Sequence, residues 1–340
     1  MNATQRPFRL RRHLNKLRWV SLSLVFAMLV LLPMIAVYQN YVAAHAYDLL
    51  SADEQRFYDL MERLTSPFAA DPAEDLDAIK GTTWAGRFFG FKIGDPLSAL
   101  GQVAASGTLY WPLLLSVLIP AVASLFLGRF FCGWICPASF LYELNTGLGV
   151  LLDRIGLRPG RRHLDRRLKY LVLAVGLGLS AATGTVLFAA IYPPAVVGRE
   201  LYYAIALNGF GTGAVFFVAT LLFDLLVARR GFCRYLCAGG ALYSLLGRYR
   251  LLRIQRIPPA CNDCTKCNVA CEFGLDPMRD GFGQECNNCT ACIAACPTDA
   301  LEFKVAWRDQ DYQGPGHLGR RYRHEHGVAE GEPTNDRENA

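Results

Sequence analysis

The sequence predicts a membrane all-α protein with four transmembrane helices, followed by a small C-terminal α+β domain. Of its 340 residues, 52% are hydrophobic and only 19% are charged. The chain is therefore too apolar for an ordinary soluble domain of this size. Four separate apolar runs are long enough to cross a bilayer as helices. Eight of the twelve cysteines lie between residues 261 and 296, well after the last of these runs, which places the second domain at the C-terminal end.

The first predicted span follows a basic leader, residues 1–18, and covers Trp19–Val37. A secretory signal is the alternative, because Ala44-His45-Ala46 resembles a cleavage site. The apolar run is longer than a signal core and ends well before that site, so an uncleaved anchor is predicted. The other predicted spans are Leu109–Leu127, Tyr170–Ile191 and Leu207–Val227.

The charges between the apolar runs predict the orientation of the chain. Basic residues dominate 128–169, and seven arginines with no acid occupy 228–257, whereas 38–108 is acidic. Since Lys and Arg remain on the cytoplasmic side, both termini and the C-terminal domain are predicted in the cytoplasm. The expected location is a bacterial inner membrane, crossed four times. This topology accounts for the net charge of +6, so lipid is an expected partner and nucleic acid is not.

Two outer segments are predicted, 38–108 and a short loop at 192–206. The first is too long for a simple connector and contains signals for amphipathic helices. Ser51 and Glu54 form a capping box before apolar residues at helical spacing. Asp95 and Pro96 predict the start of another helix, with aspartate as the cap and proline at the first position.

The C-terminal domain, predicted at 258–303, contains two cysteine runs with the same spacing. Each run is C-x2-C-x2-C-x3-C, the spacing that holds cubane iron–sulfur clusters, and the fourth cysteine of each run ligates the other cluster. The runs resemble those of bacterial two-cluster ferredoxins. Zinc is the alternative, but zinc sites usually use two separated C-x2-C pairs. The spacing predicts two [4Fe–4S] clusters, one on Cys261, Cys264, Cys267 and Cys296, and the other on Cys271, Cys286, Cys289 and Cys292.

Glu272 follows Cys271 at a position where the usual motif has proline. This difference is expected to loosen one turn and to remove no ligand. Beyond the domain, residues 304–340 are polar and charged without an apolar period, which predicts a disordered cytoplasmic tail.

The remaining cysteines form two C-x3-C pairs at the predicted cytoplasmic edge of the membrane. They are Cys132 with Cys136, after the second span, and Cys233 with Cys237, after the fourth. Both pairs follow an arginine and an aromatic residue, so the two regions look like an internal repeat. On a helix, residues four apart share a face, which would present both sulfurs of a pair together. Three interpretations stay open: inert buried cysteines, redox-active thiols, or joint ligands of a further metal or cluster.

The whole pattern resembles the NapH-type membrane ferredoxins, together with the MauN-type methylamine-utilisation proteins and the membrane part of the NosR-type regulators. The resemblance covers about residues 15–305, and its most specific stretch is Cys-Gly-Trp-Ile-Cys-Pro, residues 132–137. Two features depart from the family pattern: Ala238 follows Cys237 instead of proline, and the segment 38–108 is longer than expected. The resemblance implies membrane-bound electron transfer in a respiratory or maturation system.

The predicted function is therefore that of an electron carrier or subunit rather than a stand-alone enzyme. A quinol is a candidate donor, and a soluble ferredoxin-like protein or a respiratory enzyme subunit is a candidate redox partner. Two alternatives stay open from the residues. One is an assembly factor that reduces or hands over copper, because soft thiolates suit copper(I). The other is a redox-sensing regulator.

Overall fold

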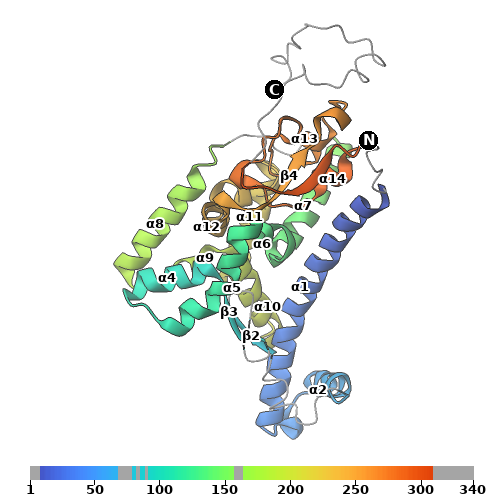
Figure 1. Ribbon diagram of the computed structural model, residues 1–340. Coiled ribbons are helices and arrows are strands. Elements are labelled where there is room, and N and C mark those ends of the chain that lie inside the picture. The colour runs from blue at the N-terminus through green and yellow to red at the C-terminus, as the bar shows by residue number, and fades with distance from the viewer. Residues whose placement is uncertain (1–7, 68–78, 82–84, 89–90, 157–163, 309–340) are drawn as a thin grey trace, which may run out of the picture.

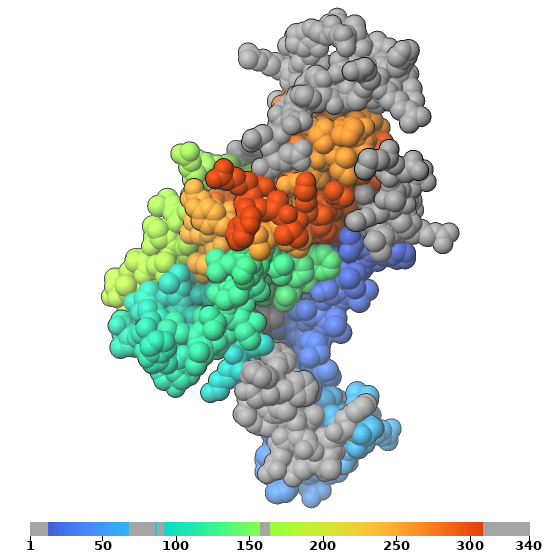
Figure 2. Space-filling view, in the orientation of Figure 1, coloured from blue at the N-terminus to red at the C-terminus, as the bar shows by residue number. Residues whose placement is uncertain are grey.

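The computed structural model describes residues 8–67, 79–81, 85–88, 91–156 and 164–308. Figure 1 shows a body of helices with a small α/β module at one end. Helix α2 and the lower part of α1 project from the opposite end. In the space-filling view of Figure 2, the C-terminal module covers the end of the helical body as one continuous layer.

Helix α1, Phe8–Ala43, is one continuous element of 36 residues that contains Pro33. It begins inside the predicted basic leader and extends beyond the predicted first span. Within the described residues, its segment His13–Ala43 is the one helix long and apolar enough to cross a membrane. A short turn, η1 (Tyr47–Leu49), leads to α2, Ala52–Thr65. The predicted capping box of Ser51 and Glu54 is present at the start of α2.

The other three predicted spans correspond to shorter apolar helices: α5 (Trp111–Leu127), α8 (Leu168–Thr183) and α11 (Thr212–Leu226). Their 17, 16 and 15 residues fall short of the ~20 that usually cross a bilayer. Helix α8 ends eight residues before the predicted limit of Ile191, because Gly184 adopts the left-handed conformation that terminates helices.

Between α8 and α11 the chain forms two further helices, α9 (Phe188–Ile191) and α10 (Pro193–Ala206). The prediction of a loop at 192–206 is therefore wrong. Pro193 and Pro194 occupy the first turn of α10, where the missing N–H groups cost no hydrogen bond. Glu200 is buried in this helix, and its Oε2 accepts a hydrogen bond from Gly211 N at 2.6 Å.

Helix α4, Pro96–Ser106, lies within the segment predicted as an outer loop. Like α10, it has proline in its first turn. It starts where the sequence predicts, and the Asp95 side chain accepts a hydrogen bond from Leu97 N at 2.8 Å. Its first turn is buried, with Leu97 fully inaccessible to solvent. The chain before α4 forms a small antiparallel sheet that the sequence did not predict. Its strands are β1 (Ile79–Gly81), β2 (Ala85–Phe88) and β3 (Phe91–Gly94).

The helical body consists of two halves with the same order of elements. The first is α1, α4, α5, α6 (Phe130–Trp134) and α7 (Pro137–Arg154). The second is α8, α10, α11, the π-helical turn η3 (Phe232–Leu236) and α12 (Ala238–Leu246). The halves exchange their short helices, since α4 packs against α8 and α10 packs against α1. Likewise, α7 contacts α1 and α11, while α12 contacts α8 and α5.

The C-terminal module is built on two antiparallel strands, β4 (Leu252–Arg256) and β5 (Leu301–Val305). They pair from Leu252 with Val305 to Arg256 with Leu301. Two short helices, α13 (Lys266–Ala270) and α14 (Ala291–Ala295), carry the last turns of the cysteine runs. The turns η4 (Gly247–Tyr249), η5 (Pro258–Ala260), η6 (Pro277–Arg279) and η7 (Gly283–Glu285) complete the segment. The module thus occupies 252–305, starting six residues before the predicted boundary. The predicted tail lies outside the described residues from 309 onward.

Candidate functional site

The two cysteine runs of the module share one backbone conformation. In each loop, the residues two and four positions after the first cysteine have positive φ: 51° and 57° at Asp263 and Thr265, and 54° and 64° at Asn288 and Thr290. These left-handed residues turn the loop back on itself, so that consecutive cysteines face one centre. The duplication inferred from spacing is therefore also a duplication of local geometry.

The first predicted set of cysteines meets at one cavity. The cavity is lined by Cys261, Cys264, Cys267 and Cys296, together with apolar residues that include Pro277, Met278 and Leu301. The fourth cysteine comes from the second run, as the exchange rule predicts. Its sulfur accepts a hydrogen bond from Ala300 N at 3.2 Å. Such N–H donors favour a thiolate over a thiol.

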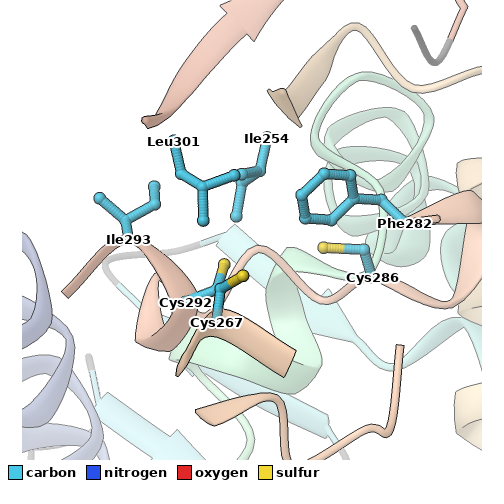
Figure 3. Packing of buried hydrophobic residues seen from close by; sticks show 7 residues of the cluster. All are labelled: Ile254, Cys267, Phe282, Cys286, Cys292, Ile293 and Leu301. Carbon is cyan, nitrogen blue, oxygen red and sulfur yellow. The ribbon is translucent and has the colours of Figure 1, made fainter. Parts of the chain in front are cut away.

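The second predicted set also comes together. Burial raises the pKa of Cys292 well above its ordinary value, and the thiols of Cys289, Cys286 and Cys271 raise it further. Burial likewise raises the pKa of Cys289 to about 12. Ligands must lose these protons when iron binds, so binding is coupled to proton release. Figure 3 shows Cys267, Cys286 and Cys292 converging beneath the apolar side chains of Ile254, Phe282, Ile293 and Leu301.

The apolar surroundings and the four-thiol geometry fit two iron–sulfur clusters. Within the described ranges, no three His, Cys, Asp or Glu side chains are grouped as ligands of a single metal ion. The two sets are neighbours, because α13 packs against α14 and Cys267 of the first set also acts on the pKa of Cys292. Helix α14 also contacts α1, which puts the Cys271 set on the side of the module facing the helical body.

The two C-x3-C pairs, far apart in the sequence, line a single cavity. We call it the thiol cavity, lined by Cys132, Cys136, Cys233 and Cys237. In each half, the first cysteine lies in the short turn after the long helix. The second cysteine is the N-cap residue of the next helix, Cys136 for α7 and Cys237 for α12. The sequence predicted two thiols on one face in each pair, and tertiary structure unites both pairs.

Two buried arginines also line the thiol cavity and connect it to the module. Arg129 Nη1 donates to the Glu285 carboxylate at 2.7 Å, and Arg230 Nε donates to that of Glu272 at 2.6 Å. Each arginine stands three residues before the first cysteine of its pair. Glu285 immediately precedes Cys286, and Glu272 immediately follows Cys271. The residue that replaces proline after Cys271 is therefore paired with a buried arginine, which the sequence alone did not indicate.

Glu285 is shared by a second cation and a hydroxyl group. The buried ammonium of Lys169 forms an ion pair with it, and Tyr170 OH donates to it at 2.9 Å. Burial opposes ionisation of Glu285, but the positive charges of Arg129 and Lys169 outweigh burial and lower its pKa below the ordinary value. Other contacts hold the same interface: Trp134 Nε1 donates to Asn288 O at 3.0 Å, beside the second cysteine loop.

A second, larger cavity opens beside the thiol cavity and was not predicted. This apolar pocket measures about 300 Å³ and is lined by Leu24, Val25, Met28, Leu29, Leu32, Gly86, Ile93, Gly94, Asp95, Pro120, Phe131, Ile135 and Tyr243. Its polar groups are Asp95 and Tyr243, and Asp95 Oδ2 accepts from Tyr243 OH at 3.1 Å. Tyr192, which lines the thiol cavity, donates to the same oxygen at 3.0 Å. The two cavities therefore share a hydrogen-bonded wall.

A family model described as a 4Fe-4S binding domain matches the chain twice, at residues 109–155 and 210–258. Each match contains one C-x3-C pair and lies before the eight cysteines of the module. The two matched segments also correspond to each other in the two halves, α5 to α7 and α11 to α12. No solved structure matches the chain.

Among curated proteins, the ferredoxin-type protein NapH of Escherichia coli is 36% identical over 180 residues, which are 52% of this chain and 59% of NapH. The methylamine utilization ferredoxin-type protein MauN of Methylorubrum extorquens is 31% identical over 215 residues, 60% of this chain and 69% of MauN. MauN of Paracoccus denitrificans is 31% identical over 207 residues, with 60% and 70% covered. The chain thus aligns with about three fifths of NapH and slightly more than two thirds of MauN.

Proposed function

The chain belongs to the NapH/MauN family of ferredoxin-type electron-transport proteins, and from this premise we propose that it is a membrane-bound electron carrier with two [4Fe–4S] clusters. The observation that supports this best is the meeting of four thiols at one cavity of the module, three from the first run and one from the second. Bound clusters would supply one-electron transfer without making or breaking covalent bonds.

The protein's own residues hold the proposed ligands and exclude water from them. Left-handed residues shape both loops, and the apolar cluster around Ile254 and Phe282 packs against cysteines of both sets. Arg129 and Arg230 fix the module against the helical body through Glu285 and Glu272. In this arrangement, the Cys271 set faces the membrane part and the Cys261 set faces away from it. In the proposed route, electrons therefore pass from the membrane part to the Cys271 set and then to the Cys261 set.

Chemical analysis of the full chain, purified without oxygen, tests this function. We expect at least about eight irons per chain, with matching acid-labile sulfide and cubane signals in electron paramagnetic resonance after reduction. Stoichiometric copper with no cubane signal would favour the alternative of copper handling during assembly. Zinc in place of iron would contradict both functions.

We further propose that α1, α5, α8 and α11 cross the membrane, with both termini and the module on the cytoplasmic side. The short helices present apolar side chains on their outer faces: Leu115 of α5, Leu171 of α8 and Val215 of α11 are all more than half exposed. A large exposed apolar surface of this kind marks contact with lipid. The basic residues of the two junctions support the orientation.

The orientation predicts the outcome of reporter fusions. Alkaline phosphatase, which is active only outside the cytoplasm, should be active when fused after Ser66 and inactive when fused after Arg308. A cytoplasmic fluorescent reporter at the same positions should give the opposite result. Phosphatase activity after Arg308 would contradict the proposed topology.

The apolar pocket is the proposed site of the electron donor, a quinol. Its volume of about 300 Å³ lies at the lower end of the range for small-molecule sites, enough for a quinol head group. Oxidation of one quinol to a quinone releases two electrons and two protons, and two clusters would accept one electron each. Asp95, which lines the pocket, is the proposed acceptor of one of these protons, and the other would pass to the solvent.

Replacing Asp95 with asparagine should slow reduction of the clusters by quinol about 10²- to 10⁴-fold, the usual contribution of a general base. Asparagine also caps helices well, so α4 should remain folded. The measurement is the rate at which a soluble quinol bleaches the cluster absorbance, with dithionite reduction as the internal reference. Tyr249→Phe, at an exposed tyrosine, is the matched control and should not change the rate. An unchanged rate in Asp95→Asn would contradict the proposal that quinol is oxidised in this pocket.

A further inference from the structure

The thiol cavity lies where the two halves of the helical body meet. Cys132 and Cys136 come from the first half, and Cys233 and Cys237 from the corresponding positions of the second half. The correspondence continues beyond the cysteines. Tyr142 and Tyr243 each follow the second cysteine of their half by six positions, and both are almost completely buried. The cavity is thus formed equally by two copies of one structural unit.

All four thiols lie deep in the protein but retain accessible surface, because they border this cavity. Inert cysteines in a close-packed core would instead be covered by neighbouring side chains. The thiol cavity measures about 20 Å³, and the cavity of the Cys261 set in the module measures about 10 Å³. The two four-thiol cavities are therefore similar in volume.

The charges around the thiol cavity suit a negatively charged occupant. Arg129 is 1% exposed, and its Nε has no hydrogen-bond partner among the described residues. Together with Lys169 it faces one carboxylate, Glu285, so a positive charge is left over beside the thiols. A centre with four thiolates carries net negative charge, and a buried charge requires such compensation.

The helix ends add to this effect. Cys136 and Cys237 are the N-caps of α7 and α12, helices of 18 and 9 residues. Gly240 N donates a hydrogen bond to Cys237 Sγ at 3.3 Å. The N-terminus of a helix stabilises negative charge and lowers the energy of a thiolate relative to a thiol.

The position of the cavity connects the other two proposed sites. Phe273, two residues after Cys271, lines the thiol cavity from the module side. Tyr192 lines it from the other side and reaches Asp95 in the wall of the apolar pocket. The thiol cavity therefore lies between the pocket proposed for quinol and the cysteine set nearest the membrane part.

We propose that Cys132, Cys136, Cys233 and Cys237 together bind a third iron–sulfur cluster at the contact between the two halves. A polynuclear cluster suits this arrangement better than one zinc or copper ion. The thiol cavity is lined by four cysteines and is similar in size to the cavity of the Cys261 set in the module, for which an iron–sulfur cluster is proposed. The role of this cluster in electron transfer rests on the proposed function, but its existence does not.

The test compares the metal content of full-length variants purified anaerobically. In the double variant Cys132→Ser/Cys233→Ser, iron per chain should fall by about two to four, depending on cluster type, with an equal loss of acid-labile sulfide. The cubane signals of the module should persist. Cys264→Ser is the matched control, since it should remove iron from the module and leave the third cluster in place.

Unchanged iron in the double variant would overturn the proposal, as would a loss of copper or zinc in place of iron. If the double variant does not accumulate, Mössbauer spectroscopy of the unmodified chain decides: more than about eight irons in clusters supports the third site, and eight or fewer contradicts it. Failure of the carrier function gives a different result, because the module signals themselves would then be missing.

Discussion

Replacing Cys289 with serine should remove about four irons per chain and abolish reduction of the remaining module cluster by quinol. Serine is a poor substitute for a thiolate, which is the ligand that iron–sulfur clusters require. In the proposed arrangement, Cys289 belongs to the set on the side of α1, between the helical body and the Cys261 set. Loss of the cluster that Cys289 holds should therefore also stop electron transfer to the Cys261 set. Iron analysis and quinol-driven bleaching of the cluster absorbance measure the two effects.

Cys264→Ser is the matched variant for this experiment. It should also remove about four irons, but the Cys271 set lies before it on the proposed route and should still be reduced by quinol. Dithionite, which does not depend on the route, should reduce the remaining cluster in both variants. Equal quinol-driven reduction in Cys264→Ser and Cys289→Ser would contradict the proposed order of the two sets.

Glu285→Gln should lower the free energy of unfolding by about 3–5 kcal/mol, the cost of breaking a buried ion pair from one side. The Glu285 side chain is 13% exposed, and its partners Arg129 and Lys169 are 1% and 0% exposed. Glutamine keeps the shape of the side chain but leaves two buried cations without a counter-charge. Denaturant titration of the purified chain in detergent measures the loss.

The exposed pair of Asp53 and Arg56 gives the control for this substitution. Their side chains are 92% and 82% exposed, and Nη1 of Arg56 lies 3.4 Å from Oδ1 of Asp53. Asp53→Asn should change the free energy of unfolding by less than about 1 kcal/mol, because water and salt screen surface pairs. A similar small change in Glu285→Gln would show that the ion pairs do not hold the module on the helical body.

The two cysteine loops of the module could be predicted because their geometry is local. Cysteines spaced two apart are close in any compact loop, and the left-handed residues Asp263, Thr265, Asn288 and Thr290 lie within the runs themselves. The exchange of the fourth cysteine follows from the duplication. The early start of the module at Leu252 was missed, because a single strand gains its stability from β5, about fifty residues later.

The short helices α4 and α10 show the opposite case. Pro193 and Pro194 lie in the segment predicted as a short outer loop, although prolines are equally suited to the first turn of a helix. Glu200, within the segment predicted as a loop, is buried and accepts a hydrogen bond from Gly211 N at the start of α11. Only packing against α1 reveals that this segment lies inside the helical body.

By itself, the sequence determined the family, the eight cysteines of the module and the apolar character of the helical body, because these depend on spacing and composition. Tertiary structure decided that two C-x3-C pairs about a hundred residues apart share one cavity, and that Arg129 and Arg230 join this cavity to the module. It also formed the apolar pocket that Asp95 lines, which the sequence did not predict. The physical reason is that side chains from separate helices meet only after both halves have packed, and no local pattern records such a meeting.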